Sequence, residues 1–422
     1  MSPFRLSHTA IIVPASSPNA YAVARGLRAA SIPVIALDHC SNAPLRHSRF
    51  CKFRLCPDAV QSELGFTEYL AELAGGLRAK PVVFPTQDLH QFLLCRNRPS
   101  LEDKVIFSFM DCDAALDCLD KRRMYPKAIA SGLTVPETFF PSDPEELSRY
   151  ACSLRRYPYI VKPAAKFELR DGSIQSNFLF YRKYETKALR CSDAGQLLRT
   201  FTDVWETGLS AVVQEEIGGP TTNLWAIDFY ADRNSSITHH HTGRKIRQYP
   251  SDFGTCTLGR SEERRELVDL AGPLVRKLGF RGIGNIEFKE RDGRLYFLEI
   301  NPRAWQWLHL ASASGVNLPA AAYADMTGER VAPASTRRRQ PGLWLDLRRD
   351  TEHVRLLKRG AGASENLGLG RWLTSVARAR VEAISSLSDP LPLMFLVARN
   401  LFTRLVRRRA RAAPGGATGT RY

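Results

Sequence analysis

Residues 284–303 decide the fold of this chain: Gly284-Asn285-Ile286-Glu287-Phe288 is followed, after one turn, by Leu295-Tyr296-Phe297-Leu298-Glu299-Ile300-Asn301-Pro302-Arg303. Both runs are rich in large apolar residues and are joined through Arg291-Asp292-Gly293, which predicts a hairpin. Side chains alternate across a strand, so Glu299 and Asn301 should share one face and Tyr296, Leu298 and Ile300 the other. Oxygen ligands on one face and hydrophobic side chains on the other are typical of a core strand that presents a hard cation such as Mg²⁺.

The length of the turn decides whether Glu287 joins this face. A two-residue turn at Asp292-Gly293 would pair Glu287 with Leu298 and send Glu287 to the face opposite Glu299. A three-residue loop over 291–293, with a left-handed glycine, returns Glu287 to the face of Glu299. We predict the three-residue loop. The alternative is a surface hairpin with ordinary acids, but acids within such dense apolar runs are expected to be buried, and buried acids need partners.

The composition is that of a globular protein. A length of 422 residues permits two or three domains, and 44% of the residues are hydrophobic. No apolar run approaches the ~20 residues that span a bilayer, and the N-terminus has no secretory signal pattern. The nine cysteines are scattered without a Cys-x-x-Cys pair. They predict reduced thiols in a cytoplasmic protein.

The net charge of +17 is concentrated at the C-terminal end, where residues 331–422 hold 18 Lys and Arg against 6 Asp and Glu. The rest of the chain is much nearer neutrality and contains no nucleic-acid-binding motif, so no nucleic-acid partner is predicted. The sequence does not set the oligomeric state.

The N-terminal residues alternate between strand and helix patterns, which predicts a small doubly wound, Rossmann-like α/β domain over 1–120. Its expected strands are 9–13, 33–37, 81–85 and 105–109, with a helix over 20–30. The first loop lacks G-x-G-x-x-G, so dinucleotide binding is not predicted. Gln87 and Asp88 follow a strand end, where such sheets bind ligands, although helix capping is an equal alternative.

A second pattern begins at Lys121 and predicts an α+β domain over 121–332. Its expected elements are a helix over 121–131, strands over 159–163, 211–217 and 224–230, and a helix over 262–278. Residues 333–422 form a basic, partly helical extension. Its apolar and basic residues after Pro392 could form an amphipathic helix, which either lies on an anionic membrane surface or packs on the body.

Four features of the second domain converge on a nucleoside triphosphate. Lys121 begins a helix and Lys162 ends a strand, and lysines supply point charges for phosphate oxygens. The strand that carries Gln214 ends at Gly218-Gly219, where free backbone groups can hold an adenine edge. The hairpin supplies the metal site, and a divalent cation neutralises charge during phosphoryl transfer.

The order of these features resembles the ATP-grasp superfamily from about Ser7 to Ala332. In detail the chain is similar to the predicted carboxylate–amine ligases of that superfamily, which include D-aspartate ligase and uncharacterised carboligases. The resemblance is carried by DKRRMYPKAIASGLTVPET (120–138), YPYIVKP (157–163), QEEIGG (214–219), TGRKIRQYPSDFGT (242–255), FRGIGNIEFK (280–289) and LYFLEINPRAWQW (295–307).

The resemblance implies a pre-ATP-grasp, Rossmann-like domain followed by two α+β lobes with ATP between them. It implies the following roles for residues of this sequence: Lys121 and Lys162 on the phosphates; Gln214, Glu215, Glu216 and Ile217 on the adenine; Glu287, Glu299 and Asn301 on two Mg²⁺ (or Mn²⁺) ions; and Arg303, with Arg244, Lys245 and Arg247, at the acyl phosphate and acceptor.

Two departures from the family pattern affect these expectations. Residues 164–199 contain only Gly172 and Gly195, so the usual glycine-rich phosphate loop is missing and Lys187 is the expected substitute. Thr221-Thr222-Asn223 stands where a relative often offers an acid to the ribose, and Asp228 is the possible replacement.

The implied function is a cytoplasmic ligase, and its tail is a candidate for peripheral contact with the inner membrane surface. It would activate a substrate carboxylate as an acyl phosphate with ATP and then join it to an amine. The alternatives are a hydroxyl or thiol acceptor, or a non-catalytic ATP-binding regulator or adaptor at the membrane. The sequence names neither the acid nor the amine.

The other conspicuous residues have structural interpretations. His239-His240-His241 cannot all face one metal ion from a strand, although His241 alone could lie near the phosphates. Trp305, Trp307 and His309 could line the acceptor pocket, and core packing is an equal alternative.

Overall fold

A parallel four-stranded sheet lies in the N-terminal part of the chain. The computed structural model describes residues 6–170, 173–331, 342–357, 368–384 and 386–399. The sheet has the order β3-β2-β1-β4 and consists of β1 (Ala10–Val13), β2 (Val34–Asp38), β3 (Lys52–Leu55) and β4 (Val82–Pro85). The strand predicted over 105–109 is wrong: only Ile106 bridges Val82, because the Phe109 N–H turns back to the Phe107 carbonyl at 2.8 Å.

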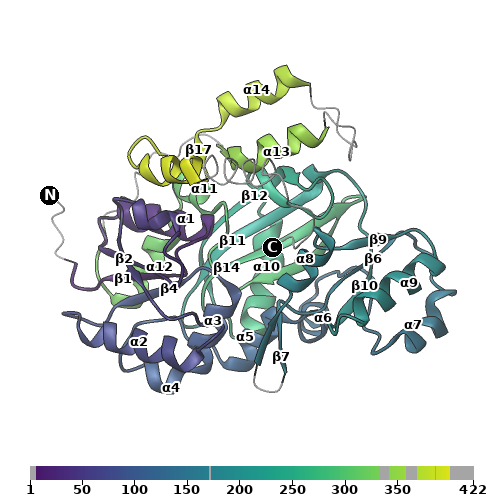
Figure 1. The fold of residues 1–422 in the computed structure, drawn as a ribbon, viewed down its shortest axis with the longest axis horizontal. Helices are drawn as coiled ribbons and strands as arrows, with labels where there is room; N and C mark the ends of the chain where they lie inside the picture. Colours follow the sequence, from purple (N-terminus) through teal and green to yellow (C-terminus); the bar gives the residue numbers. More distant parts are fainter. Residues whose placement is uncertain (1–5, 171–172, 332–341, 358–367, 385, 400–422) are drawn as a thin grey trace, which may run out of the picture.

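Helices cover both faces of this sheet (Figure 1). Apolar residues of α1 (Pro18–Ala29) and α12 (Leu318–Thr327) are buried together with alternate residues of β1 and β2. The opposite face packs on α2 (Glu63–Gly75) and α3 (Asp88–Arg96), with α4 (Arg98–Leu101) and α5 (Cys112–Leu119) beyond them. Since α12 lies near the end of the predicted second domain (121–332), that part of the chain returns to close the N-terminal sheet.

A second, antiparallel sheet has the order β5-β10-β6-β9 and lies at the right of Figure 1. Its strands are β5 (Thr138–Phe139), β10 (Ala211–Glu215), β6 (Tyr159–Pro163) and β9 (Leu189–Cys191). The helices α7 (Pro144–Ala151) and α9 (Ala194–Trp205) bury their apolar residues against one face of it. The predicted strand over 159–163 is confirmed, and β10 ends two residues before the predicted end.

Two short elements lie between β6 and β9, in the region that lacks the glycine-rich loop of the family pattern. They are the hairpin β7 (Phe167–Arg170)–β8 (Ser173–Ser176) and the helix α8 (Phe178–Tyr184). The segment before β5 is α6 (Lys121–Ala130), which begins where predicted because Asp120 accepts a capping hydrogen bond from the Arg122 N–H at 2.8 Å.

The third sheet has seven strands, in the order β15-β14-β11-β12-β13-β16-β17. Its long strands are β11 (Leu224–Ala231), β12 (Ile237–Tyr249), β13 (Thr255–Ser261), β14 (Gly282–Arg291) and β15 (Arg294–Asn301). The helix α10 (Glu266–Lys277) packs on one face through Leu267, Ala271, Leu274 and Val275, which confirms the predicted helical spacing. The face of the sheet opposite α10 carries the polar residues of β14 and β15.

The turn between β14 and β15 differs from the prediction. Arg291 pairs with Arg294, so the turn has two residues, Asp292 and Gly293, with φ of 53° and 75°. The predicted three-residue loop is wrong, because two consecutive positive φ values form a tight turn that matches strand twist. A β-bulge then shifts the register by one residue: Phe288 pairs with Phe297, but Glu287 pairs with Glu299.

This bulge has two consequences for the faces of the hairpin. Glu287 lies on the face of Glu299, as predicted but for a different reason. Leu298, the extra residue, lines the cleft beside Glu299 while Ile300 is buried in the core. The prediction that Leu298 and Ile300 share a face is therefore wrong.

The C-terminal part adds two strands to the third sheet. These are β16 (Leu343–Leu345) and β17 (Val381–Glu382), and β16 pairs with β13. The helices α13 (Leu347–Leu357) and α14 (Leu369–Arg378) lie at the top of Figure 1, and residues 391–399 are also helical. The arginine runs at 337–339 and 404–411 lie outside the described residues. No helix of the described part is long and apolar enough to cross a bilayer.

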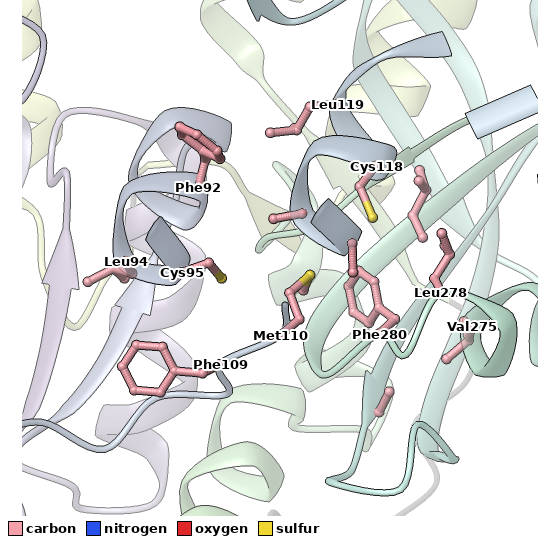
Figure 2. Packing of buried hydrophobic residues seen from close by; sticks show 14 of the residues in the cluster. Phe92, Leu94, Cys95, Phe109, Met110, Cys118, Leu119, Val275, Leu278 and Phe280 are labelled. Atoms are coloured by element: carbon pink, nitrogen blue, oxygen red, sulfur yellow. The ribbon is translucent and has the colours of Figure 1, made fainter. Parts of the chain in front are cut away.

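One hydrophobic cluster joins the N-terminal part to the third sheet (Figure 2). Phe92 of α3 and Phe109 belong to the same buried cluster as Val275 and Phe280, and Met110 is buried between the two parts. Because this packing is continuous, it fixes the position of the first residues of α3 relative to β15. All nine cysteines are free, as predicted.

Candidate active site

A cleft of about 490 Å³ lies between the second and third sheets. Charged side chains dominate its wall: eight Lys and Arg against six Asp and Glu. The lysines come from both sides and are Lys121, Lys162, Lys166, Lys187, Lys245 and Lys289. A cleft with this surplus of cationic side chains suits an anionic ligand.

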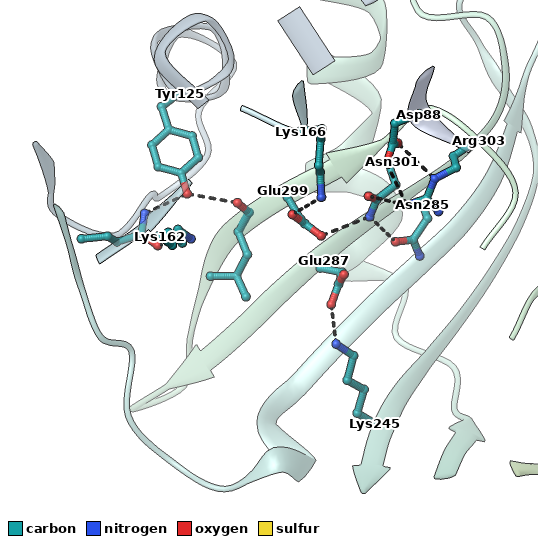
Figure 3. A network of polar contacts seen from close by, with 12 residues as sticks. Asp88, Tyr125, Lys162, Lys166, Lys245, Asn285, Glu287, Glu299, Asn301 and Arg303 are labelled. Atoms are coloured by element: carbon teal, nitrogen blue, oxygen red, sulfur yellow. Dashed lines mark hydrogen bonds and ion pairs between the residues drawn. The ribbon is translucent and has the colours of Figure 1, made fainter. Parts of the chain in front are cut away.

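The floor of the cleft is the polar face of β14 and β15 (Figure 3). Glu287 and Glu299 are direct cross-strand partners, and so are Asn285 and Asn301. The Asn301 Nδ2 lies 3.3 Å from the Asn285 Oδ1 and 3.4 Å from the Glu299 Oε1. Asn301 lies at the end of the cleft floor, fully buried, and its carboxamide links Glu299 to Asn285.

A lysine holds each of the two carboxylates. The Lys166 Nζ lies 2.7 Å from the Glu299 Oε2, and the Lys245 Nζ lies 2.7 Å from the Glu287 Oε2. Burial alone would raise the pKa of Glu299, but the Lys166 and Lys121 charges outweigh it and hold this pKa well below its usual range. Glu299 is therefore an anion, as a cation ligand must be.

The donor set of this floor fits a hard cation such as Mg²⁺. Two carboxylates and a carboxamide on adjacent strands supply the oxygen ligands that Mg²⁺ prefers. The described residues contain no group of three His, Cys, Asp or Glu that could hold a metal ion. A cation here would therefore take its other ligands from water or phosphate, which is common for Mg²⁺.

Three lysines on the other side of the cleft have lowered pKa values. Burial, and then the Lys121 charge, lowers the pKa of Lys162 to about 7. Burial, followed by the charge of a neighbouring lysine, lowers the pKa of Lys121 and of Lys187 to about 8. An anion between these lysines would relieve their mutual repulsion.

The side chain of Gln214 positions Lys162. Its Oε1 accepts from the Lys162 Nζ at 2.6 Å, and its Nε2 donates to the Tyr125 and Thr138 hydroxyls, each at 2.8 Å. Because both donor hydrogens and one lone pair are used, the expected contact of this side chain with adenine is not favoured.

The strand end after Gln214 opens into the cleft. Glu215 is buried and accepts from the Arg291 Nη1 at 2.6 Å, and Glu216 forms a bidentate pair with Arg190 at 2.6 and 2.5 Å. The ladder ends at Glu215, so the Glu216 carbonyl and the Ile217 N–H lie beyond it. These backbone groups, beside the buried Ile217 side chain, can bind a planar heterocycle.

Arg303 connects the cleft to the N-terminal sheet. Its Nε lies 3.0 Å from the Asp88 Oδ1 and its Nη2 lies 3.1 Å from the Asp88 Oδ2. Asp88 is the first residue of α3 and follows β4 closely. Gln87 is the N-cap of this helix but makes no capping hydrogen bond, so the helix-capping alternative is not favoured and the ligand-site interpretation is. Trp305 lies beside Arg303 and Lys245, whose cationic groups are 6.0 and 5.8 Å from its ring centre.

Comparison with known proteins identifies the fold. Residues 241–345 match the family model described as "ATP-grasp in the biosynthetic pathway with Ter operon". The chain resembles the biotin carboxylase domain of 2-oxoglutarate carboxylase from Hydrogenobacter thermophilus, solved with MgADP and bicarbonate, with a TM-score of 0.60 and 17% identity over 80% of this chain and 74% of that one. It also resembles an L-amino acid ligase from Bacillus licheniformis, with a TM-score of 0.55 and 14% identity over 77% and 75% of the two chains.

The chain has the ATP-grasp fold. The predicted fold is thus confirmed. A curated relative, the arginine-specific carbamoyl phosphate synthase large chain of Geobacillus stearothermophilus, is 45% identical over 58 residues. These 58 residues are 14% of this chain and 6% of that relative, so the chain spans only a small part of the relative's length.

Several residues predicted at the ATP-grasp cleft lie elsewhere. Arg244 pairs with Glu262 at 3.0 Å and stacks on Trp225, because β12 alternates and places Lys245, not Arg244, on the cleft face. Arg247 is buried in an ion pair with Asp350 of α13 at 2.7 Å. Both are corrections to the predicted basic group around Lys245.

The other candidate positions are also settled by their contacts. Asp228 is buried, accepts from the Asn285 Nδ2 at 2.9 Å and lies 3.5 Å from His241, so it is not a ribose ligand. His241 does not line the cleft, and its Nε2 lies 2.9 Å from the Ser261 hydroxyl. Trp307 is a core residue packed on glycines of β12 and β13.

Sequence reasoning missed four residues of the ATP-grasp cleft. Lys166, Lys289, Arg190 and Asn285 each contact a predicted site residue or line the cleft. Lys289 and Asn285 had a signal in the sequence, since each stands two residues from Glu287 on one strand and so shares its face. Lys166 had none, because the chain leaves β6 before it and no periodicity sets the direction of its side chain.

Hairpin β7–β8 and α8 stand where many ATP-grasp proteins have a glycine-rich loop. Lys166, Lys187 and the aromatic side chains of Phe178 and Tyr181 line the cleft from this segment and the turn after it. Lys187 thus lies at the cleft, and its contact with phosphate stays a prediction.

Proposed function

We propose that the chain is an ATP- and Mg²⁺-dependent ligase that activates a substrate carboxylate as an acyl phosphate and joins it to an amine. One observation carries the proposal: Lys121, Lys162 and Lys187 face the paired Glu287 and Glu299 across a single cleft. Lysines for phosphates opposite carboxylates for a cation are what phosphoryl transfer requires. The L-amino acid ligase among the structural relatives supports an amine acceptor.

The domain organisation that fits this activity has three parts. Residues 1–120 are a Rossmann-like pre-ATP-grasp domain, residues 121–332 are two lobes with ATP between them, and residues 333–422 are a basic, partly helical extension. The pairing of β16 with β13 supports a structural role for the start of the extension, because it widens the sheet behind Lys245.

In the proposed reaction, the protein positions charges and does not supply a nucleophile. Lys121, Lys162 and Lys187 hold the phosphates, and the Glu216 carbonyl and Ile217 N–H hold the adenine edge. The substrate carboxylate attacks the γ-phosphate, ADP leaves, and the amine attacks the acyl carbonyl as phosphate departs. Arg303 and Lys245 face the transferred group, and their cationic donors stabilise the charge that develops there.

Glu287, Glu299 and Asn301 would hold one or two Mg²⁺ (or Mn²⁺) ions, which supply charge neutralisation for the phosphates. Lys166 lies against Glu299 and would contact the same phosphate oxygens. Closure of α8 over the cleft would exclude the water that hydrolyses an acyl phosphate.

The test is ADP release by the full chain, with a panel of carboxylic acids and amines supplied singly and together. The ligase requires that release depends on both an acid and an amine. ADP release that requires an acid together with a hydroxyl or thiol compound would show that the acceptor is a hydroxyl or a thiol. ATP binding without turnover in every mixture would make the chain a regulator and overturn the ligase.

We also propose a cytoplasmic location with peripheral contact to the inner membrane. Leu391, Met394 and Val397 are exposed on the helical residues 391–399, close to the basic C-terminal end of the sequence. An exposed apolar face beside basic residues suits an anionic membrane surface. Loss of vesicle binding on Met394→Ser would support this contact, and unchanged binding would exclude it.

A further inference from the structure

A second cavity, of about 590 Å³, lies away from the nucleotide cleft. It is an open pocket lined by α1, α11 (Leu308–Ala313), the loop at Arg49-Phe50 and the C-terminal residues 386–388. Figure 1 shows α1, α11 and β17 close together at this place. No residue that lines this cavity lines the cleft, so the two are separate sites.

The wall of this cavity is cationic. Arg25, Arg28 and Arg49 line it, together with His309 and the hydroxyls of Ser386 and Ser388, and no described lining residue is an acid. Within the described part of the chain, neither the Arg28 nor the Arg49 guanidinium takes part in an ion pair. This differs from the nucleotide cleft, where carboxylates balance most of the positive charge.

The cavity is built from well-fixed parts. The Arg25 Nη1 donates to the Glu382 carbonyl at 2.6 Å, and its guanidinium stacks on Tyr21 at 4.4 Å. Buried Asp389 accepts from the Tyr21 and Ser48 hydroxyls, each at 2.6 Å, and from the Arg49 N–H at 3.1 Å. These contacts fasten the C-terminal segment to the N-terminal sheet and so form the cavity. Asp389 offsets part of the charge but is not one of the lining residues.

His309 adds a polar group that points to a ligand. Its Nδ1 is buried and has no hydrogen-bond partner among the described residues. Burial, and then the Arg25 charge, lowers the pKa of His309 to about 3, so the ring is neutral and can donate one N–H. Buried polar atoms are nearly always bonded, and an unpaired one beside a cavity is accounted for by a bound group.

We propose that this cavity binds the phosphate groups of a small anion, as a second site separate from the proposed ATP site. Guanidinium groups bind phosphate oxygens through paired hydrogen bonds, and the His309 N–H and the serine hydroxyls supply further donors. The volume is within the range of small-molecule sites and exceeds the need of one phosphate. The anion is either soluble or the headgroup of a lipid.

The experiment uses the full chain and measures the binding of inorganic pyrophosphate by calorimetry without added metal. The site variant is Arg28→Gln/Arg49→Gln, since both side chains are exposed and their loss spares the fold. We expect this variant to bind at least about tenfold more weakly, because charge-assisted hydrogen bonds are lost. Arg46→Gln, an exposed arginine outside the cavity, is the matched control and should bind as the wild type does.

Pyrophosphate can also enter the nucleotide cleft, so the titration is repeated with saturating ADP, which occupies the phosphate positions of that cleft. The part of the pyrophosphate binding that depends on Arg28 and Arg49 should remain. The second arm measures sedimentation with phosphatidylcholine vesicles that contain phosphatidylglycerol. If only vesicle binding depends on Arg28 and Arg49, the phosphate belongs to a lipid headgroup. The proposal is overturned if neither probe binds, if the double variant binds both as the wild type does, or if saturating ADP abolishes the pyrophosphate binding that depends on Arg28 and Arg49.

Discussion

Glu287 and Glu299 are direct cross-strand partners, although the turn that joins their strands has only two residues. A regular ladder from such a turn would place the two carboxylates on opposite faces. The bulge at Leu298 adds one residue and brings them together, as bulges next to active sites often do. The proposed metal site therefore depends on a local irregularity of the sheet.

The first prediction concerns the metal-binding carboxylate. Glu299→Gln should lower ADP release by about 10²-fold or more, because a bound divalent cation contributes several kcal/mol of charge stabilisation. The amide has nearly the same volume, so the fold should be kept, but the midpoint of thermal unfolding should fall because the ion pair with Lys166 is lost. Glu266→Gln, an exposed acid on α10, is the control and should keep full turnover. Normal turnover of Glu299→Gln would remove the metal assignment.

The second prediction concerns the hairpin turn. Gly293 has a φ of 75° and its added Cβ would meet no atom within 4 Å, so only backbone strain opposes a side chain there. Gly293→Ala should lower the free energy of unfolding by about 1–2 kcal/mol in denaturant titrations. Asp292→Gly, at the neighbouring positive φ, should not destabilise the protein. Equal stability of Gly293→Ala and the wild type would contradict the observed turn.

The third prediction concerns the protonation of Lys162, whose pKa burial lowers to about 7. At about pH 8 the free amine is mostly neutral, and a bound phosphate raises its pKa, so nucleotide binding should take up a proton. Calorimetry of ADP binding in buffers of different ionisation enthalpy measures this uptake. The affinity for ADP should fall as the pH rises above the pKa of about 7 of the free Lys162 amine, because binding must then protonate this amine. Lys162→Gln should reduce the uptake, and an unchanged value would assign the proton to another group.

The fourth prediction concerns the geometry of Arg303. Its guanidinium is held by both oxygens of Asp88, so a lysine would keep the charge but lose the paired contacts. Arg303→Lys should lower kcat by about 10²-fold, with ADP affinity nearly unchanged. Arg294→Lys, at the start of the strand that precedes Arg303 and outside the cleft, is the control. A rise in KM for ATP with normal kcat would instead place Arg303 in nucleotide binding.

The sequence by itself determined the ATP-grasp fold and most of the cleft. Strand and helix periods predicted β6, β11 and α10, and the resemblance of the order of Lys162, Glu287 and Glu299 to the ATP-grasp pattern predicted which residues meet. These signals are local, because alternation along a strand and apolar spacing along a helix are set by backbone geometry.

Tertiary structure alone decided the remaining features of the site. The bulge at Leu298 is selected by the packing of Phe297 and Ile300 on either side of it, which no local pattern encodes. Lys166 reaches Glu299 across the cleft, and Asp88 reaches Arg303 from another sheet. Contacts between segments so distant in sequence depend on how whole layers pack, because the energy of that packing belongs to no single segment.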